Sequence, residues 1–249
     1  MPVAPDPEIG QAATRNKAFA NAFTRGRILA EAVGAEALTV LDVGAFTGET
    51  AAWFADLFPK ATIWAVEPFS DSYAVLAAAD HPRVRPFQFA ATDAEGTATL
   101  FANDIPHTNS LYPINSESRD SVDISRRREQ GVLDEAQLLS SVEVPAHRLD
   151  GFADGQGIGE IDLLKIDVQG AEVDVLRGSS GILERVGVIM IEISLYDYYT
   201  SSSSIGAVEE LVSPFGFALW SITDTSHNPI NGRTDWVELL YRKPASVNR

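Results

Sequence analysis

Apolar and polar positions along the chain alternate in blocks that switch between strand-like and helix-like spacing. Short apolar runs typical of buried strands occur at residues 39–43, 62–68, 84–91, 161–168 and 186–193. Helical spacing is found at residues 48–58, 70–80 and 205–215. This alternation predicts an α/β fold with a doubly wound, mostly parallel sheet that is buried on both faces. The last two runs, 217–223 and 236–243, leave no room for a helix between them and should pair antiparallel at one edge.

Three segments depart from this alternation. A helical pattern from about Pro7 to Ala35 predicts an N-terminal helical extension, residues 1–37, ahead of one domain, residues 38–249. Residues 93–102 predict a hairpin with its turn at Glu95 and Gly96. From His107 to about Gln137 the sequence is polar and irregular, which predicts a mobile lid over the site.

Composition narrows the classes of function. With 249 residues, 45% of them hydrophobic, the chain is long enough for one sizeable core, and the absence of cysteine excludes disulfides and a thiol nucleophile. A formal net charge of −16 disfavours nucleic acid and anionic membranes as partners, and the basic cluster 126–128 is interpreted as a solvated helix face. Without a signal-peptide core or a long apolar run, the expected location is cytoplasmic. The expected partner is a small, uncharged or weakly charged molecule, and a homo-oligomer stays open.

The turn after the first predicted strand carries candidate chemistry. Asp42, Gly44 and Gly48 form a D-x-G-x-x-x-G pattern, whereas a dinucleotide site needs G-x-G-x-x-G. In a parallel sheet this turn lies where ligands bind. An acidic residue there favours a cationic group over a pyrophosphate, and Glu67 ends the next strand, where it can accept both hydroxyls of a ribose. A ribose with a cationic amino-acid group predicts S-adenosylmethionine.

Several motifs support this interpretation by resemblance. The segments "LDVGAFTGET", "VEPFSDSYAVL", "AATDAEGTATL", "NSLY", "VPAHRLDGF", "IDLLKIDVQGAEVDVLRGS" and "VIMIEI" stand in the order typical of the FkbM-family S-adenosylmethionine-dependent methyltransferases. The resemblance runs from about Leu38 to Ser194, and "KIDVQGAE" is its most specific part. It implies the Rossmann-like class I methyltransferase fold, with seven strands, and O-methylation of natural-product or sugar hydroxyls.

Strand ends and resemblance together predict the cofactor-binding residues. At Phe46 the family commonly carries asparagine, so this chain lacks a side-chain amide at that position. The "NSLY" match adds a loop on the cofactor side. The predicted set is Asp42, Gly44, Ala45, Phe46, Thr47, Gly48, Thr50, Glu67, Pro68, Phe69, Ala91, Thr92, Asp93, Asn109, Ser110 and Asp167.

Methyl transfer to a hydroxyl also needs a proton acceptor, which typically contributes about 10²–10⁴-fold. Asp167 and Glu192 end two central strands and are the predicted catalytic pair, with His107 or His227 as the fallback base. Lys165, inside an apolar strand, should pair with Asp167 or Glu192, because an unpaired buried ammonium is costly. The carboxylates could hold Mg²⁺, but the cofactor already explains acid-rich strand ends, so no metal is predicted.

Two alternatives stay open at this stage. A nucleotide-dependent oxidoreductase or epimerase shares the predicted sheet, but it should show the three-glycine turn and a Tyr-x-x-x-Lys pair, and the sequence has neither. A non-catalytic protein that retains the S-adenosylmethionine turn is the other alternative, with modest support from Phe46.

Overall fold

The computed structural model describes residues 17–19, 22–118, 138–228 and 231–243. Its main sheet has seven strands in the order β3-β2-β1-β7-β8-β10-β9. The bounds of these strands are β1 Thr39–Val43, β2 Thr62–Val66, β3 Val84–Phe87, β7 Ile161–Ile166, β8 Val186–Ser194, β9 Ala218–His227 and β10 Thr234–Arg242.

The sheet is parallel from β3 to β8 and antiparallel where β10 joins it. β9 lies at the edge and pairs antiparallel with β10, because the short connection between them permits only a hairpin. Both the seven-stranded doubly wound sheet and the antiparallel final pair are therefore confirmed. The strand order reverses at the boundary between β1 and β7, which places a crevice outside the carboxyl ends of these two strands.

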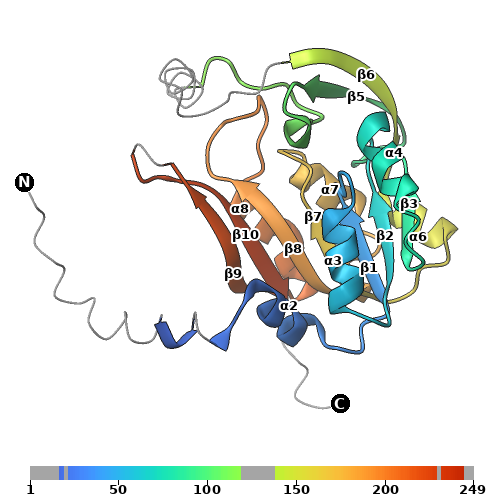
Figure 1. The fold of residues 1–249 in the computed structure, drawn as a ribbon. Helices are drawn as coiled ribbons and strands as arrows, with labels where there is room; N and C mark the ends of the chain where they lie inside the picture. Colours follow the sequence, from blue (N-terminus) through green and yellow to red (C-terminus); the bar gives the residue numbers. More distant parts are fainter. Residues whose placement is uncertain (1–16, 20–21, 119–137, 229–230, 244–249) are drawn as a thin grey trace, which may run out of the picture.

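Helices cover both faces of this sheet (Figure 1). One core layer joins the sheet to α2, α3 and α4, and the other joins it to α6, α7 and α8. The bounds of the helices are α2 Arg25–Val33, α3 Glu49–Leu57, α4 Ser70–Ala78, α6 Leu149–Gly155, α7 Glu172–Gly178 and α8 Ile205–Val212, with short 3-10 turns η1 Pro106–Thr108, η2 Leu183–Arg185 and η3 Ser213–Phe215.

The helix of the predicted extension packs on the main sheet. Ile28, Leu29 and Ala32 of α2 are buried in the core beside the sheet. The prediction of one continuous helix up to Ala35 is wrong, because Phe23 and Thr24 are not helical. Thr24 instead starts α2 as its N-cap, since its hydroxyl accepts a hydrogen bond from the amide of Arg27 at 3.2 Å. The earlier part of that helical prediction, residues 7–16, lies outside the described residues.

A second, three-stranded sheet stands above the carboxyl ends of the main sheet (Figure 1). Its order is β4-β6-β5, with the bounds β4 Ala90–Ala91, β5 Gly96–Asn103 and β6 Leu138–His147. Two predictions are corrected here. The run 84–91 is not one strand but is divided between β3 and β4, and the hairpin at Glu95–Gly96 does not form, because β4 and β5 both pair with β6.

Two further points bear on the predictions. Residues 119–137, most of the predicted lid together with its basic cluster, lie outside the described residues. Within the described part of the chain, no helix is long and apolar enough to cross a membrane.

Candidate active site

A cavity of about 650 Å³ opens at the carboxyl ends of the central strands, at the reversal of strand order. Its walls come from the β1–α3 turn, the end of β2, β4, the segment 106–111, the β7–α7 loop, the end of β8 and the β9–β10 hairpin. This size suits a small-molecule site. Parallel strands carry their terminal residues to one edge, which is why side chains so distant in sequence share this cavity.

The β1–α3 turn needs glycine because the chain packs tightly on itself there. Gly44 and Gly48 have positive φ angles of 77° and 96°. A Cβ on Gly44 would lie 1.8 Å from the backbone oxygen of Asp167, and one on Gly48 would lie 2.7 Å from Leu76 Cδ1. The neighbouring backbone thus requires glycine at residue 44, whereas at residue 48 the positive φ favours glycine and the Leu76 side chain would have to move to admit a Cβ. Phe46, between them, also has a positive φ, of 50°.

Glu67 is held as a fixed acceptor at the end of β2. Its Oε2 accepts a hydrogen bond from the amide of Phe46 and its Oε1 accepts one from the amide of Phe69, both at 2.9 Å. The side chain is buried, and burial raises the pKa of the carboxyl although these amides work against it. Each oxygen keeps a further lone pair, so the carboxylate has the form of an acceptor for two neighbouring hydroxyls.

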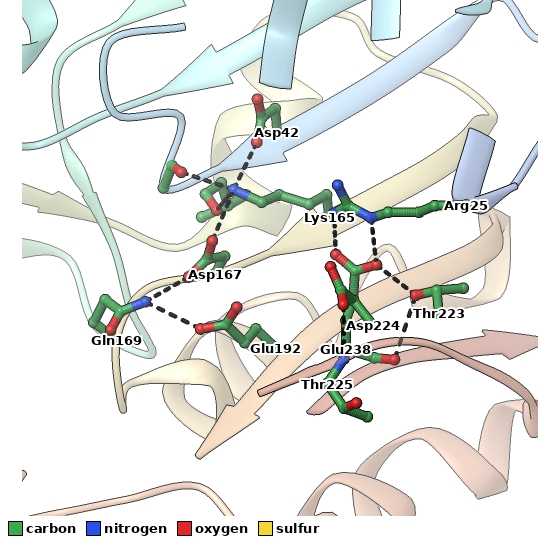
Figure 2. A network of polar contacts seen from close by, with 12 residues as sticks. Arg25, Asp42, Lys165, Asp167, Gln169, Glu192, Thr223, Asp224, Thr225 and Glu238 are labelled. Atoms are coloured by element: carbon green, nitrogen blue, oxygen red, sulfur yellow. Dashed lines mark hydrogen bonds and ion pairs between the residues drawn. The ribbon is translucent and has the colours of Figure 1, made fainter. Parts of the chain in front are cut away.

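At the cavity floor, Lys165 of β7, which lines the cavity, pairs with Asp42 of β1 (Figure 2). Lys165 Nζ lies 3.0 Å from Asp42 Oδ1 and 3.6 Å from Asp167 Oδ2, and it donates to the backbone oxygen of Gly44 at 2.7 Å. Burial alone would lower the pKa of Lys165, but the attraction of Asp42 and Asp167 outweighs it and raises the pKa. Lys165 is therefore a buried cation compensated by two carboxylates.

This arrangement changes two sequence interpretations. The predicted Lys165–Asp167 contact is present, but the shorter contact is to Asp42, and no ion pair joins Lys165 to Glu192 among the described residues. Asp42 is fully buried and does not line the cavity, and burial raises the pKa of its carboxyl. Its positive partner within the chain is Lys165, where the sequence argument had assigned a cationic ligand.

Asp167 and Glu192 both lie at the cavity wall, and the side-chain amide of Gln169 contacts both carboxylates from one side (Figure 2). Gln169 Nε2 donates to Asp167 Oδ1 at 2.8 Å and to Glu192 Oε1 at 3.3 Å. Burial, and then repulsion from Asp167, raises the pKa of Glu192 to about 8. A carboxyl group with such a pKa exchanges its proton near neutral pH, as a general base must.

Glu172, a third acid of the same motif, serves the local backbone. It is buried, and its Oε1 accepts hydrogen bonds from the amides of Gly170 at 2.9 Å and Val168 at 3.3 Å. Burial raises the pKa of its carboxyl to about 7. These bonds shape the β7–α7 loop that carries Asp167 and Gln169 into the cavity.

The two histidine candidates are placed differently. His107, in η1, lines the cavity. His227 is exposed at the end of β9, and its neighbours Ser226 and Asn228 line the cavity instead, because successive strand residues point to opposite faces. His107 is thus the histidine that the fold brings to the site.

The structure brings most of the predicted cofactor residues to one cavity. Those that line it are Gly44, Ala45, Phe46, Thr50, Glu67, Pro68, Ala91, Asn109, Ser110 and Asp167. Those that do not line it are Asp42, Thr47, Gly48, Phe69, Thr92 and Asp93. Phe69 contributes through its backbone amide on Glu67, and Gly48 through the turn.

Sequence reasoning missed most of the cavity wall opposite the β1–α3 turn. Gln169, Tyr196 and Tyr198 line the cavity, as do Arg233 and Trp236 of the β9–β10 hairpin. The guanidinium of Arg233 lies 4.8 Å from the ring centre of Tyr196, whose ring is 5.6 Å from that of Tyr198. Gln169 stood in a motif already singled out and could have been found, whereas the hairpin residues reach the site only through strand pairing.

The fold and this cavity define the class of protein: a Rossmann-like α/β protein with a cavity of small-molecule size at the reversal of strand order. The model of the methyltransferase FkbM domain matches residues 42–219, and the chain belongs to this family. It is therefore an S-adenosylmethionine-dependent methyltransferase, and S-adenosylmethionine is its cofactor. Membership of a methyltransferase family argues against the oxidoreductase or epimerase alternative.

Individual proteins show the same likeness. The 2-O-methyltransferase NoeI of Sinorhizobium fredii is 29% identical over 181 residues, covering 71% of each chain. Methyltransferase sdnD of Sordaria araneosa is 29% identical over 153 residues, covering 56% of this chain and 59% of that protein. Among solved structures, a Methanococcus jannaschii fibrillarin pre-rRNA processing protein is similar, with a TM-score of 0.47 and 13% identity, covering 84% of this chain and 67% of that one.

Proposed function

We propose that this enzyme transfers the methyl group of S-adenosylmethionine to a hydroxyl oxygen of a small molecule, such as a natural product or a sugar. The observation that carries this proposal is the carboxylate pair Asp167 and Glu192 at the wall of the cavity, with the pKa of Glu192 raised to about 8. An alcohol must lose a proton when it is methylated, and this pair supplies a group that can take it. The name of the relative NoeI, a 2-O-methyltransferase, agrees with an oxygen acceptor.

The residues present fit the cofactor. The fixed carboxylate of Glu67 would accept the ribose hydroxyls, and Gly44, Ala91, Asn109 and Ser110 would complete the surrounding wall. S-adenosylmethionine supplies an electrophilic methyl group when bound. The protein contributes largely by holding donor and acceptor in line, since such positioning can account for much of the rate of a displacement.

Asp167 and Glu192 divide the work on the acceptor. Ionised Glu192 would accept the hydrogen bond of the reacting hydroxyl and take its proton as the oxygen–methyl bond forms and the methyl–sulfur bond breaks, and Asp167 would orient the acceptor beside it. Lys165 Nζ lies 3.6 Å from Asp167 Oδ2, so the chain itself places a cation beside this member of the pair. His107 is the fallback base, since it also lines the cavity.

A screen tests the proposal. The full-length protein is incubated with methyl-labelled S-adenosylmethionine and a panel of sugars, phenols and aliphatic alcohols, with matched amines and thiols, and products are read by mass spectrometry. Label on a hydroxyl oxygen, lost in both Asp167→Asn and Glu192→Gln, is the expected result. Transfer only to nitrogen or sulfur would contradict an oxygen acceptor.

The remaining features of the proposal rest on the sequence. The net charge of −16 argues against nucleic acid and anionic membrane as partners, and a cytoplasmic location is part of the proposal. We also propose the division into an N-terminal extension, residues 1–37, and a domain, residues 38–249; within the described residues, Arg25 Nε donates to Glu238 Oε1 at 2.8 Å across this boundary. Cell fractionation tests the location, a nucleic-acid mobility shift tests the expected lack of nucleic-acid binding, and limited proteolysis tests the boundary of the extension.

A further inference from the structure

Gln169 lies in a loop, yet specific contacts hold both its backbone and its side chain. Its backbone adopts a positive φ of 58°, a conformation that side chains other than glycine, asparagine and aspartate seldom take. Both N–H groups of its side-chain amide have acceptors, Asp167 Oδ1 at 2.8 Å and Glu192 Oε1 at 3.3 Å. Backbone strain of this kind persists when the surroundings hold it in place.

Tyr199 determines which way this amide faces. The hydroxyl of Tyr199 lies 3.0 Å from Gln169 Oε1 and 3.0 Å from the backbone oxygen of Thr108, and its single hydrogen can be donated to either oxygen. The tyrosine is 1% exposed and therefore cannot readily turn away. A flipped amide would set its oxygen 2.8 Å from Asp167 Oδ1, where two acceptors repel. Nε2 therefore faces the carboxylates.

The backbone of Gln169 is held from the cofactor side of the cavity. Ser110, which is buried, donates its hydroxyl to the backbone oxygen of Gln169 at 2.6 Å. The next residue, Gly170, packs so closely that a Cβ there would lie 3.1 Å from the backbone oxygen of Ser201. Gln169 is thus fixed by the segment 106–111, by Tyr199 and by its own loop.

We propose that Gln169 is a positioning residue for methyl transfer: its amide Nε2 ties Asp167 to Glu192 and keeps both carboxylates directed at the acceptor. Figure 2 shows this bridge between the ends of β7 and β8. The proposal rests on the proposed function, because it assigns Gln169 to the same carboxylate pair. Gln169 itself need not touch the reacting atoms.

The bridge has an electrostatic consequence. Asp167 and Glu172 work to raise the pKa of Glu192, and Lys165 works to lower it. Glu238 stands directly opposite Glu192 on β10, but it is paired with Arg25. The amide of Gln169 donates to the ionised form of Glu192 and so lowers its pKa. Removing this donor should move the pKa upward and leave the two carboxylates without their common partner.

Matched variants distinguish the positioning role of the Gln169 amide from a role of this side chain in packing alone. Gln169→Met keeps an unbranched side chain and the same backbone strain but removes the amide, and Gln169→Gly removes the amide while relieving the strain. Tyr199→Phe keeps the amide and removes the group that orients it. Gln156→Met, at an exposed glutamine, is the control for the substitution itself.

Two measurements are made on each full-length variant. Carboxyl NMR of protein labelled with ¹³C-glutamate follows the titration of Glu192, assigned by its loss in Glu192→Gln, without any acceptor. Single-turnover transfer is measured with the best acceptor of the screen at saturating S-adenosylmethionine, and the Kd of the cofactor is measured by calorimetry.

In Gln169→Met and Gln169→Gly we expect the pKa of Glu192 to move from about 8 toward about 9, the size expected for one charge-assisted hydrogen bond. Transfer should fall at least about 10-fold with the cofactor Kd within about twofold. Tyr199→Phe should show smaller changes in the same direction, and Gln156→Met none.

Several results would overturn the proposal. An unchanged titration with unchanged transfer shows that the bridge is not made, and a moved pKa with unchanged transfer shows that the reaction does not use it. A loss of transfer that follows a weakened cofactor Kd assigns Gln169 to the fold alone. Absence of transfer in the wild type contradicts the proposed function instead, and the titration then decides on the bridge by itself.

Discussion

Lys165 and Asp42 are partners in the register of β7 and β1, and their side chains form a 3.0 Å ion pair at the floor of the cavity, which Lys165 lines. The pair spans the boundary at which the strand order reverses, so one contact joins the two halves of the sheet just below the site. Replacing a buried pair as a whole can be nearly neutral, whereas removing one member leaves an uncompensated charge.

The first prediction concerns this ion pair. Lys165→Met should destabilise the protein by about 3–5 kcal/mol, because Asp42 stays buried without its cation. Urea unfolding at pH 7 measures the change. The double variant Lys165→Met, Asp42→Leu should regain part of the loss. A single variant within about 0.5 kcal/mol of the wild type would contradict a structural role for the pair.

The second prediction concerns Glu67 and the cofactor. Glu67→Gln keeps one acceptor oxygen but removes the charge, so S-adenosylmethionine should bind about 10- to 100-fold more weakly through the loss of charge-assisted hydrogen bonds. Calorimetry measures the affinity, with circular dichroism as the check on folding. Glu36→Gln, at an exposed glutamate, is the control. Equal affinities in the two variants would remove Glu67 from the ribose site.

The third prediction concerns pH. If ionised Glu192 is the base, single-turnover transfer should rise with pH through its pKa of about 8, and Glu192→Gln should lose about 10²-fold or more and the pH dependence with it. Stability should change in the opposite sense. The folded-state pKa lies above the ordinary glutamate value of 4.5, so the stability from protonated Glu192 is complete below that value and is lost as pH rises through about 8. A variant that keeps the wild-type pH profile would assign the proton to another group, His107 first.

The fourth prediction compares two glycines of similar conformation. Gly44 and Gly157 have φ angles of 77° and 69°, but only an added Cβ at Gly44 meets a neighbour, the backbone oxygen of Asp167 at 1.8 Å. Gly44→Ala and Gly157→Ala should share a backbone cost of about 1 kcal/mol, and Gly44→Ala should cost about 1–3 kcal/mol more through the clash. Thermal unfolding of both variants measures the two losses of stability. Equal losses would show that backbone conformation alone requires glycine at residue 44.

The periodicity of the sequence was enough to predict the main sheet but not the three-stranded sheet. Long apolar runs such as 186–193 identify buried strands without reference to partners. β4 has two residues, and it exists only because it pairs with β6, which local pattern cannot show. The predicted hairpin failed for the same reason, since Gly96 begins a strand whose partner starts at Leu138.

Some residues of the candidate site could be predicted from the sequence, and others could not. Glu67, Asp167 and Glu192 could be predicted because they end consecutive or neighbouring strands, and strand ends converge in a parallel sheet. The true partner of Asp42 could not be predicted, because the strand register that places Lys165 beside it depends on how the strands pack. Arg233 and Trp236 enter the cavity wall through an antiparallel hairpin, which a parallel strand-end argument does not cover.

The adjacency of β1 and β7 also affects how the protein folds during its synthesis. Lys165 and its acceptor on β1, the backbone oxygen of Val43, are 122 residues apart in the chain. Closing so long a loop is entropically unfavourable until other contacts compensate, and topologies rich in such contacts fold slowly. During synthesis the first half of the sheet emerges from the ribosome well before β7 does. The cavity floor is therefore among the later parts to assemble, and a nascent chain truncated before β7 carries the β1–α3 turn without a site that could retain the cofactor.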